Sequence, residues 1–132
     1  MFASFADPVN IRYDVLHDLL RSQPEELHQH SHAVARLAGD LARAIGCSPY
    51  EQERIQTGAL LHDIGKQFIP SAILDKEDSL TPAEYRLVQQ HVELGHSYLL
   101  RFVSDGILLN IVLYHHERWD GGGYPFGMVG KD

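Results

Sequence analysis

Two histidine-containing motifs carry the side chains of this sequence that are best suited to chemistry. The first is the doublet His62-Asp63, followed closely by Lys66, and the second is the pair His115-His116. Imidazole and carboxylate groups are ligands that suit iron, manganese, zinc or magnesium. A neighbouring lysine can bind a phosphoryl oxygen or protonate a leaving alkoxide. Together these residues favour hydrolysis of a phosphate ester by a metal-activated water.

Taken one at a time, most of the candidate residues also have a plain structural explanation. Glu26 and His30 share one helix face and could form an ordinary surface pair. His91 and Gly95 have the same spacing, and the glycine leaves room for a neighbouring helix or for a metal cluster. The double histidine is harder to explain as structure alone, because two buried imidazoles would each need a partner.

Composition is that of an ordinary soluble globular protein of one domain. The chain has 132 residues, of which 44% are hydrophobic and 22% charged, and nine are histidines. The net charge of -7, with no basic stripe, argues against nucleic-acid binding. No membrane segment or signal peptide is visible, and the single Cys47 excludes an internal disulfide. We therefore expect a cytoplasmic protein.

The longest apolar repeat predicts a helix that ends at Gly46, a natural C-cap. A shorter amphipathic stretch precedes it and stops before Pro24. The apolar positions that recur at helical spacing along the long helix are Leu27, Val34, Leu37, Ala38, Leu41, Ala42 and Ile45.

Two capping boxes, Ser48-Pro49-Tyr50-Glu51 and Thr81-Pro82-Ala83-Glu84, predict the starts of further helices. Residues 67–80 between them are expected to be mostly loop, with one helical turn around residues 71–74. The apolar stretch 107–114 runs into the double histidine, and the glycines after it predict a loop over residues 120–132. In that loop, Trp119 and Tyr124 are expected either to stack on a base or to hold the loop against the helices. No strand pattern of useful length occurs, so the predicted fold class is all-α.

These motifs resemble those of the HD-GYP family, a branch of the HD phosphohydrolases. The resemblance covers about residues 26–130, and the Gly-Tyr-Pro loop after a double histidine is its most specific part. The motifs that carry it are His30, His62-Asp63-Ile64-Gly65-Lys66, His91-Val92-Glu93-Leu94-Gly95 and His115-His116-Glu117-Arg118-Trp119-Asp120-Gly121-Gly122-Gly123-Tyr124-Pro125. The resemblance implies an HD-domain bundle of about five to six helices with a glycine-rich C-terminal loop. It also implies a metal-dependent phosphodiesterase that hydrolyses the bacterial second messenger cyclic di-GMP, through a metal-activated hydroxide, to the linear dinucleotide or GMP.

The resemblance further assigns roles by position. Lys66 and Asp63 match catalytic residues, with Lys66 facing the substrate phosphate, and Gly123-Tyr124-Pro125 matches the segment that binds substrate and docks diguanylate-cyclase-type (GGDEF) partners. The implied cofactors are two or three divalent ions per site, iron or manganese foremost, with zinc, magnesium or cobalt as alternatives. Glu26 matches the glutamate that some members add for a third metal. The positions that match metal ligands are Glu26, His30, His62, Asp63, His91, His115 and His116.

The resemblance is incomplete at the C-terminal end. Family members continue into a further helix whose aspartate bridges the metals, whereas this sequence ends at Asp132. We therefore expect an HD-GYP-type domain over residues 24–132 that lacks its C-terminal helices, and two alternatives stay open. One is a catalytically incomplete signalling or interaction module, and the other is an HD phosphohydrolase for a different nucleotide. Residues 1–23 are expected to be an N-terminal helix or linker, which connects to an upstream domain, packs on the bundle or pairs chains in a homodimer.

Overall fold

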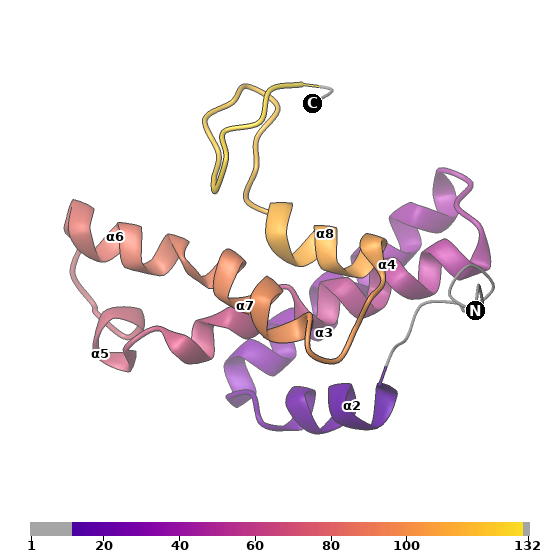
Figure 1. The fold of residues 1–132 in the computed structure, drawn as a ribbon, viewed down its shortest axis with the longest axis horizontal. Helices are drawn as coiled ribbons and strands as arrows, with labels where there is room; N and C mark the ends of the chain where they lie inside the picture. The colour runs from indigo at the N-terminus through magenta and orange to yellow at the C-terminus, as the bar shows by residue number, and fades with distance from the viewer. Residues whose placement is uncertain (1–11, 131–132) are drawn as a thin grey trace, which may run out of the picture.

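Seven α-helices and one 3-10 helix form the described part of the chain, residues 12–130 of the computed structural model (Figure 1). The all-α prediction is confirmed. Apart from α5, which is a single four-residue turn, the described part of the chain has six α-helices, in agreement with the expected five to six. The elements are α2 (Tyr13–Arg21), α3 (Glu25–Ala44), α4 (Pro49–Leu61), η1 (Ile64–Phe68), α5 (Ser71–Leu74), α6 (Pro82–Gln89), α7 (His91–Leu99) and α8 (Gly106–Tyr114).

The two predicted capping boxes are present and fix where α4 and α6 begin. The Ser48 hydroxyl accepts a hydrogen bond from the Glu51 backbone N–H at 3.1 Å, and the Glu51 carboxylate accepts one from the Ser48 N–H at 2.7 Å. Thr81 and Glu84 repeat this arrangement at the start of α6. Each box satisfies backbone donors that a helix start leaves free, so these boundaries follow from local sequence.

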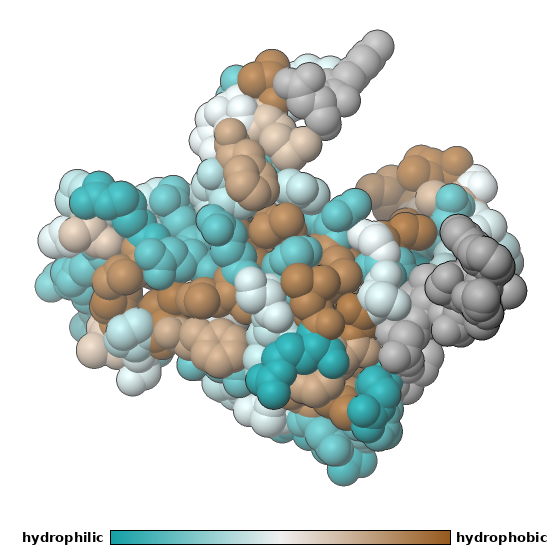
Figure 2. Space-filling view, viewed as in Figure 1, coloured by the Kyte–Doolittle hydropathy of each residue, from teal (hydrophilic) through white to brown (hydrophobic). Residues whose placement is uncertain are grey.

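The long helix α3 packs on α4 through small residues, and its leucine-rich face is turned away from the core. Leu37, Leu41 and Ile45 are 64%, 63% and 71% exposed, and apolar surface is visible toward the C-terminal end of α3 in Figure 2. The residues of α3 that are buried are Ser31, Ala35, Gly39 and Ala42. A Cβ atom at Gly39 would lie 2.1 Å from the Gln56 side chain of α4. The helix predicted from the repeat is thus present, and its large apolar residues lie away from α4 because the close approach of α4 requires small ones.

The hydrophobic core lies between α2, the end of α4, α7 and α8. Leu16 of α2 is 2% exposed and belongs to the same buried cluster as Leu61, Leu99 and Leu108. The helix within the N-terminal segment thus packs on the bundle, whereas residues 1–11 of that segment lie outside the described residues. Among the described helices, none is both long enough and apolar enough to cross a membrane.

Gly65 of η1 and Gly95 of α7 allow these two elements to cross backbone against backbone. A Cβ atom at Gly65 would lie 1.8 Å from the His91 carbonyl oxygen, and one at Gly95 would lie 3.0 Å from the Gly65 nitrogen. Of the two explanations open for Gly95, the structure shows close packing of a neighbouring element. The crossing also brings His91, at the start of α7, beside the residues that follow α4.

Replacing Gly65 by alanine is expected to lower the free energy of unfolding by about 2 kcal/mol, because a backbone oxygen cannot move aside as a flexible side chain can. Urea unfolding followed by circular dichroism measures this difference. Gly106→Ala is the matched control, since nothing lies within 4 Å of a Cβ atom at that position. Equal stability of the two variants would contradict the close crossing.

Candidate metal centre

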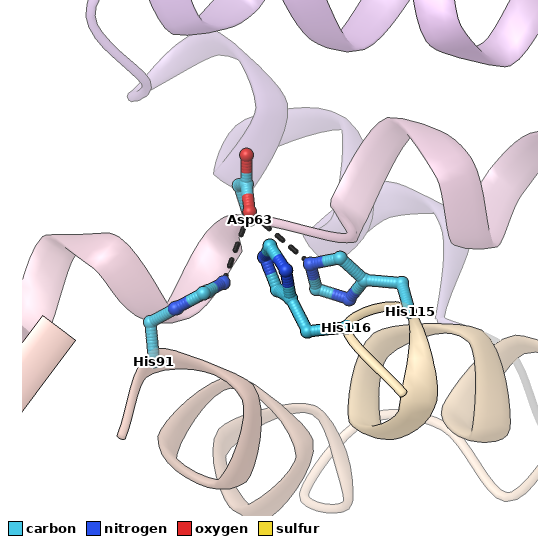
Figure 3. Close-up of side chains that lie close together, drawn as sticks. All are labelled: Asp63, His91, His115 and His116. Carbon is cyan, nitrogen blue, oxygen red and sulfur yellow. Dashed lines mark ion pairs between the residues drawn. The ribbon is translucent and has the colours of Figure 1, made fainter. Parts of the chain in front are cut away.

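The buried carboxylate of Asp63 lies at the centre of a group of histidines. Asp63 follows α4, His91 begins α7 and His115 follows α8, so three helices supply the group. The Nε2 atoms of His62, His91 and His115 lie 3.1, 3.2 and 3.4 Å from the Asp63 oxygens. Figure 3 shows His91, His115 and His116 converging on this carboxylate.

Backbone carbonyl groups fix which ring nitrogen of each histidine carries the proton. The Nδ1 atoms of His62 and His91 lie 2.6 and 2.7 Å from the carbonyl oxygens three residues earlier. The Nδ1 atom of His115 lies 3.0 Å from the Val112 oxygen. Because a carbonyl oxygen can only accept, each Nδ1–H donates, and the neutral rings present Nε2 lone pairs to the carboxylate. Metal-ligating histidines are oriented in this way.

Lone pairs therefore face lone pairs at the centre. Asp63 Oδ1, His91 Nε2 and His115 Nε2 are buried and have no hydrogen-bond partner. Each unsatisfied buried polar atom costs about 1–3 kcal/mol, and atoms of the same polarity also repel one another. A divalent cation among them would accept all of these lone pairs. The residues present thus fit a metal ion.

Two groups of candidate ligands share Asp63. The ligand atoms of each group all lie within 4.8 Å of one another. The first group contains Asp63, His91, His115 and His116, and the second contains His30, His62 and Asp63. A carboxylate has two oxygens and can bridge two cations, as in two-metal hydrolases.

Six of the seven predicted ligands are brought together in these groups, and Glu26 is not. Glu26 is exposed and lines a cavity beside the centre, together with Lys66. The Lys66 Nζ atom lies 3.3 Å from Asp63 Oδ2, and its side chain is 33% exposed. Lys66 thus stands between the carboxylate and the cavity, where an incoming anion would reach it.

Burial and neighbouring charges set the protonation states of the centre. Burial raises the pKa of Asp63, but the hydrogen bonds that His115, His62 and His91 donate to it when their rings are protonated outweigh burial and hold this pKa well below its usual range. Burial lowers the pKa of His62, yet the hydrogen bond that its protonated ring donates to Asp63 and the charge of Asp63 outweigh burial and raise this pKa. For His116, burial and then the neighbouring histidines lower the pKa to about 4. At neutral pH, Asp63 is ionised and His116 is neutral, which are the states that bind metals.

The Gly-Tyr-Pro loop is held against the centre by specific contacts. The Tyr124 ring stacks on His116, with centroids 4.7 Å apart and planes 14° apart. A Cβ atom at Gly123 would lie 2.3 Å from the His116 carbonyl oxygen, so a larger residue does not fit there. Burial raises the pKa of Tyr124 to about 12, which keeps its phenol protonated. These contacts hold the loop against the helices, and stacking of Tyr124 on a base stays a prediction.

Glu117 fixes the far side of the same loop and was not among the predicted site residues. Its carboxylate accepts hydrogen bonds from the backbone N–H groups of Phe126 and Met128 at 2.7 and 3.0 Å. The only sequence signal for this role is its position between the double histidine and the glycine-rich loop. Trp119, which was expected to stack on a base or to hold the loop, has 74% of its surface exposed.

An all-α bundle in which three helices deliver histidines to a His-Asp doublet defines the class of this protein. The HD domain family matches residues 14–132. The chain belongs to this family and, with its complete Gly-Tyr-Pro loop, to the HD-GYP branch of it.

Several characterised proteins are similar to this chain. A protein of Thermotoga maritima named cyclic di-GMP phosphodiesterase is 40% identical over 133 residues, which cover 99% of this chain and 36% of the relative. A Pseudomonas aeruginosa protein of the same designation is 40% identical over 112 residues, or 83% of this chain and 27% of the relative. A Vibrio cholerae protein named 3'3'-cGAMP-specific phosphodiesterase 2 is 34% identical over 119 residues, which cover 89% of this chain and 23% of the relative. The chain therefore spans only 23–36% of the length of these relatives.

Proposed function

We propose that this chain forms the metal-binding catalytic part of a phosphodiesterase that hydrolyses cyclic dinucleotides, cyclic di-GMP foremost. The observation that carries the proposal is the buried Asp63 carboxylate shared by two groups of histidines, with unpartnered lone pairs facing one another and Lys66 beside them. The names of the relatives support the substrate class, since they act on cyclic di-GMP or on 3'3'-cGAMP.

The proposed division of labour follows from the positions of the side chains. Asp63 and the histidines would hold divalent ions, which when bound supply the charge that activates a water and stabilises the phosphoryl oxygens. Lys66 would bind a non-bridging phosphate oxygen at the cavity side of the centre. Tyr124, whose ring covers His116, would exclude bulk water and present a neutral phenol. The proposed products are the linear dinucleotide and GMP.

We propose iron or manganese as the metals, because histidine nitrogen and carboxylate oxygen together suit these ions. Two ions correspond to the two groups that share Asp63. A third ion would use Glu26, which lies one helical turn before His30 on α3.

The Gly-Tyr-Pro loop is also our proposed docking surface for a diguanylate-cyclase-type partner. Three large apolar side chains of this loop, those of Trp119, Phe126 and Val129, are 74%, 62% and 55% exposed. Exposed apolar groups gathered on one loop are typical of an interaction site. A homodimer remains the alternative proposal for association of this chain.

The proposed function is tested by incubating the Mn²⁺-loaded or Fe²⁺-loaded protein with cyclic di-GMP, 3'3'-cGAMP and cyclic di-AMP. Chromatography is expected to show linear dinucleotide and GMP from cyclic di-GMP, at a rate that falls to background after chelation with EDTA. Bis(p-nitrophenyl) phosphate, a phosphodiester without bases, is the reference substrate. A protein that binds two metals per chain and cleaves none of the four substrates would contradict the enzyme and favour a non-catalytic module.

A further inference from the structure

The outer face of α3 carries a pair of histidines that the centre does not use. His28 and His32 are one helical turn apart, and their Nε2 atoms lie 3.2 Å apart. Successive helical residues turn by about 100°, so His30 points to the other side of α3, where its ring lies beside that of His62. The pair is therefore separate from the two groups of candidate ligands that share Asp63.

The distance between the two nitrogens of this pair is the one that a single metal ion requires. Zinc–imidazole bonds are about 2.0–2.1 Å long, so two of them at a tetrahedral angle place their nitrogens about 3.3 Å apart. At the right angle of a square-planar ion, the same bonds place the nitrogens about 2.9 Å apart. The 3.2 Å between His28 and His32 lies within this range. Both rings can thus bind one ion while the helix backbone stays in place.

A shared proton is the other occupant that fits between these nitrogens. One ring would then donate its Nε2–H to the Nε2 lone pair of the other. On an exposed helix face such a hydrogen bond contributes only about 1 kcal/mol, because water competes for both groups. Histidine is the commonest ligand of transition metals in proteins, and an ion that replaces this proton gains two nitrogen ligands at once.

The surroundings of the pair are open to solvent and balance the charge of a cation. The pair faces a depression of about 620 Å³, which is lined by His28, Gln29, His32, Ala33 and Arg36. The start of a helix is electropositive and disfavours a cation, but Glu25 and Glu26 place two carboxylates in the first turn of α3. Glu25 lies three residues before His28 and so shares its face of the helix.

The two imidazoles select among metal ions. The affinity of nitrogen ligands for divalent ions rises from manganese through nickel to copper, with zinc close behind. No carboxylate belongs to the pair itself, in contrast to the centre, where Asp63 supplies a full negative charge. We therefore expect the pair to take nickel, copper or zinc and to stay empty in Mn²⁺.

We propose that His28 and His32 form a separate, surface metal site that binds a zinc-like ion and holds it with two imidazoles. Arg36 cannot act as a ligand, so the remaining coordination positions are open to water or to a ligand from outside the chain. A bound ion would link two turns of α3, the helix that also supplies His30. The proposal does not depend on the proposed function, since neither a substrate nor the central metals take part in it.

Immobilised nickel tests the pair without involving the centre. Ni²⁺ held by nitrilotriacetate on a resin has two free coordination positions and reaches only exposed side chains, whereas Asp63 and His91 of the centre are 3% and 1% exposed. The untagged protein is expected to bind this resin and to elute with imidazole. His28→Gln and His32→Gln should each pass through, because loss of a ligand weakens metal binding by about tenfold or more, as loss of an outer-shell partner already does.

Zinc content measures the same site with a free ion. After equilibrium dialysis against Zn²⁺, mass spectrometry is expected to find one zinc ion more per chain in the wild type than in His32→Gln. Zinc taken up by the centre is common to both proteins and cancels in this difference. His17→Gln, which removes an exposed histidine of α2, is the matched control and should keep the zinc content and resin binding of the wild type.

Two double variants separate the spacing of the histidines from their number. Arg36→His added to His28→Gln places an imidazole one turn after His32, so resin binding and the additional zinc ion should return. Ala33→His added to His28→Gln restores the number of histidines but not the spacing, and it should still pass through. Equal zinc content in the wild type and His32→Gln, or resin binding that survives in both single variants, would overturn the proposal.

Discussion

Asp63→Asn is expected to remove both metal ions and to lower kcat/KM for cyclic di-GMP by about 10³-fold or more. Asp63 is the one residue common to both groups of candidate ligands, and its pKa is held well below the usual range, so it contributes a full negative charge. Asparagine keeps the shape of the side chain but supplies neither the charge nor a second oxygen ligand. Metal content is measured by mass spectrometry after gel filtration, and kcat/KM by chromatography of the products.

A graded control follows from the composition of the two groups. His30 belongs to the second group alone, so His30→Ala should lose one ion and keep the other. Asp40→Asn changes an exposed carboxylate that pairs with Arg43 on α3, and it should retain both ions and full activity. Retention of two ions and of normal kcat/KM by Asp63→Asn would show that the carboxylate does not bridge the metals.

Local sequence was sufficient for the parts of the fold that depend on neighbouring residues. The capping boxes at Ser48 and Thr81 are formed within one helical turn, and both helix starts were predicted from them. The candidate ligands were also accessible from the sequence, because the resemblance identifies them by motif. Their convergence, however, needs the crossing at Gly65, where a backbone approach between η1 and α7 brings His91 to Asp63.

Features that depend on distant contacts were not predicted. The apolar repeat predicted the helix α3, but repeat spacing does not say which face meets α4, and Leu37 and Leu41 are exposed. The answer lies in the fit between Gly39 and the side chain of Gln56.

Saturating Mn²⁺ is expected to raise the Tm of the protein by roughly 10 °C. A ligand present at a hundred times its Kd stabilises the folded state by about 2.7 kcal/mol, and each kcal/mol shifts the Tm of a domain of this size by about 3–5 °C. The physical origin is the set of unpartnered lone pairs on Asp63, His91 and His115, whose mutual repulsion a cation removes. Differential scanning calorimetry with and without Mn²⁺ measures the shift.

The location of the stabilising ion is decided by two variants. His28 and His32 form a second, exposed pair on α3 with Nε2 atoms 3.2 Å apart, and such a pair could bind a metal without any relation to the centre. His32→Gln should therefore keep the full shift in Tm, whereas Asp63→Asn should reduce it to less than about 2 °C. The opposite result, with the shift lost in His32→Gln and kept in Asp63→Asn, would place the ion on the surface of α3. In that case the buried carboxylate would need a proton on His62, whose pKa it raises, to balance its charge.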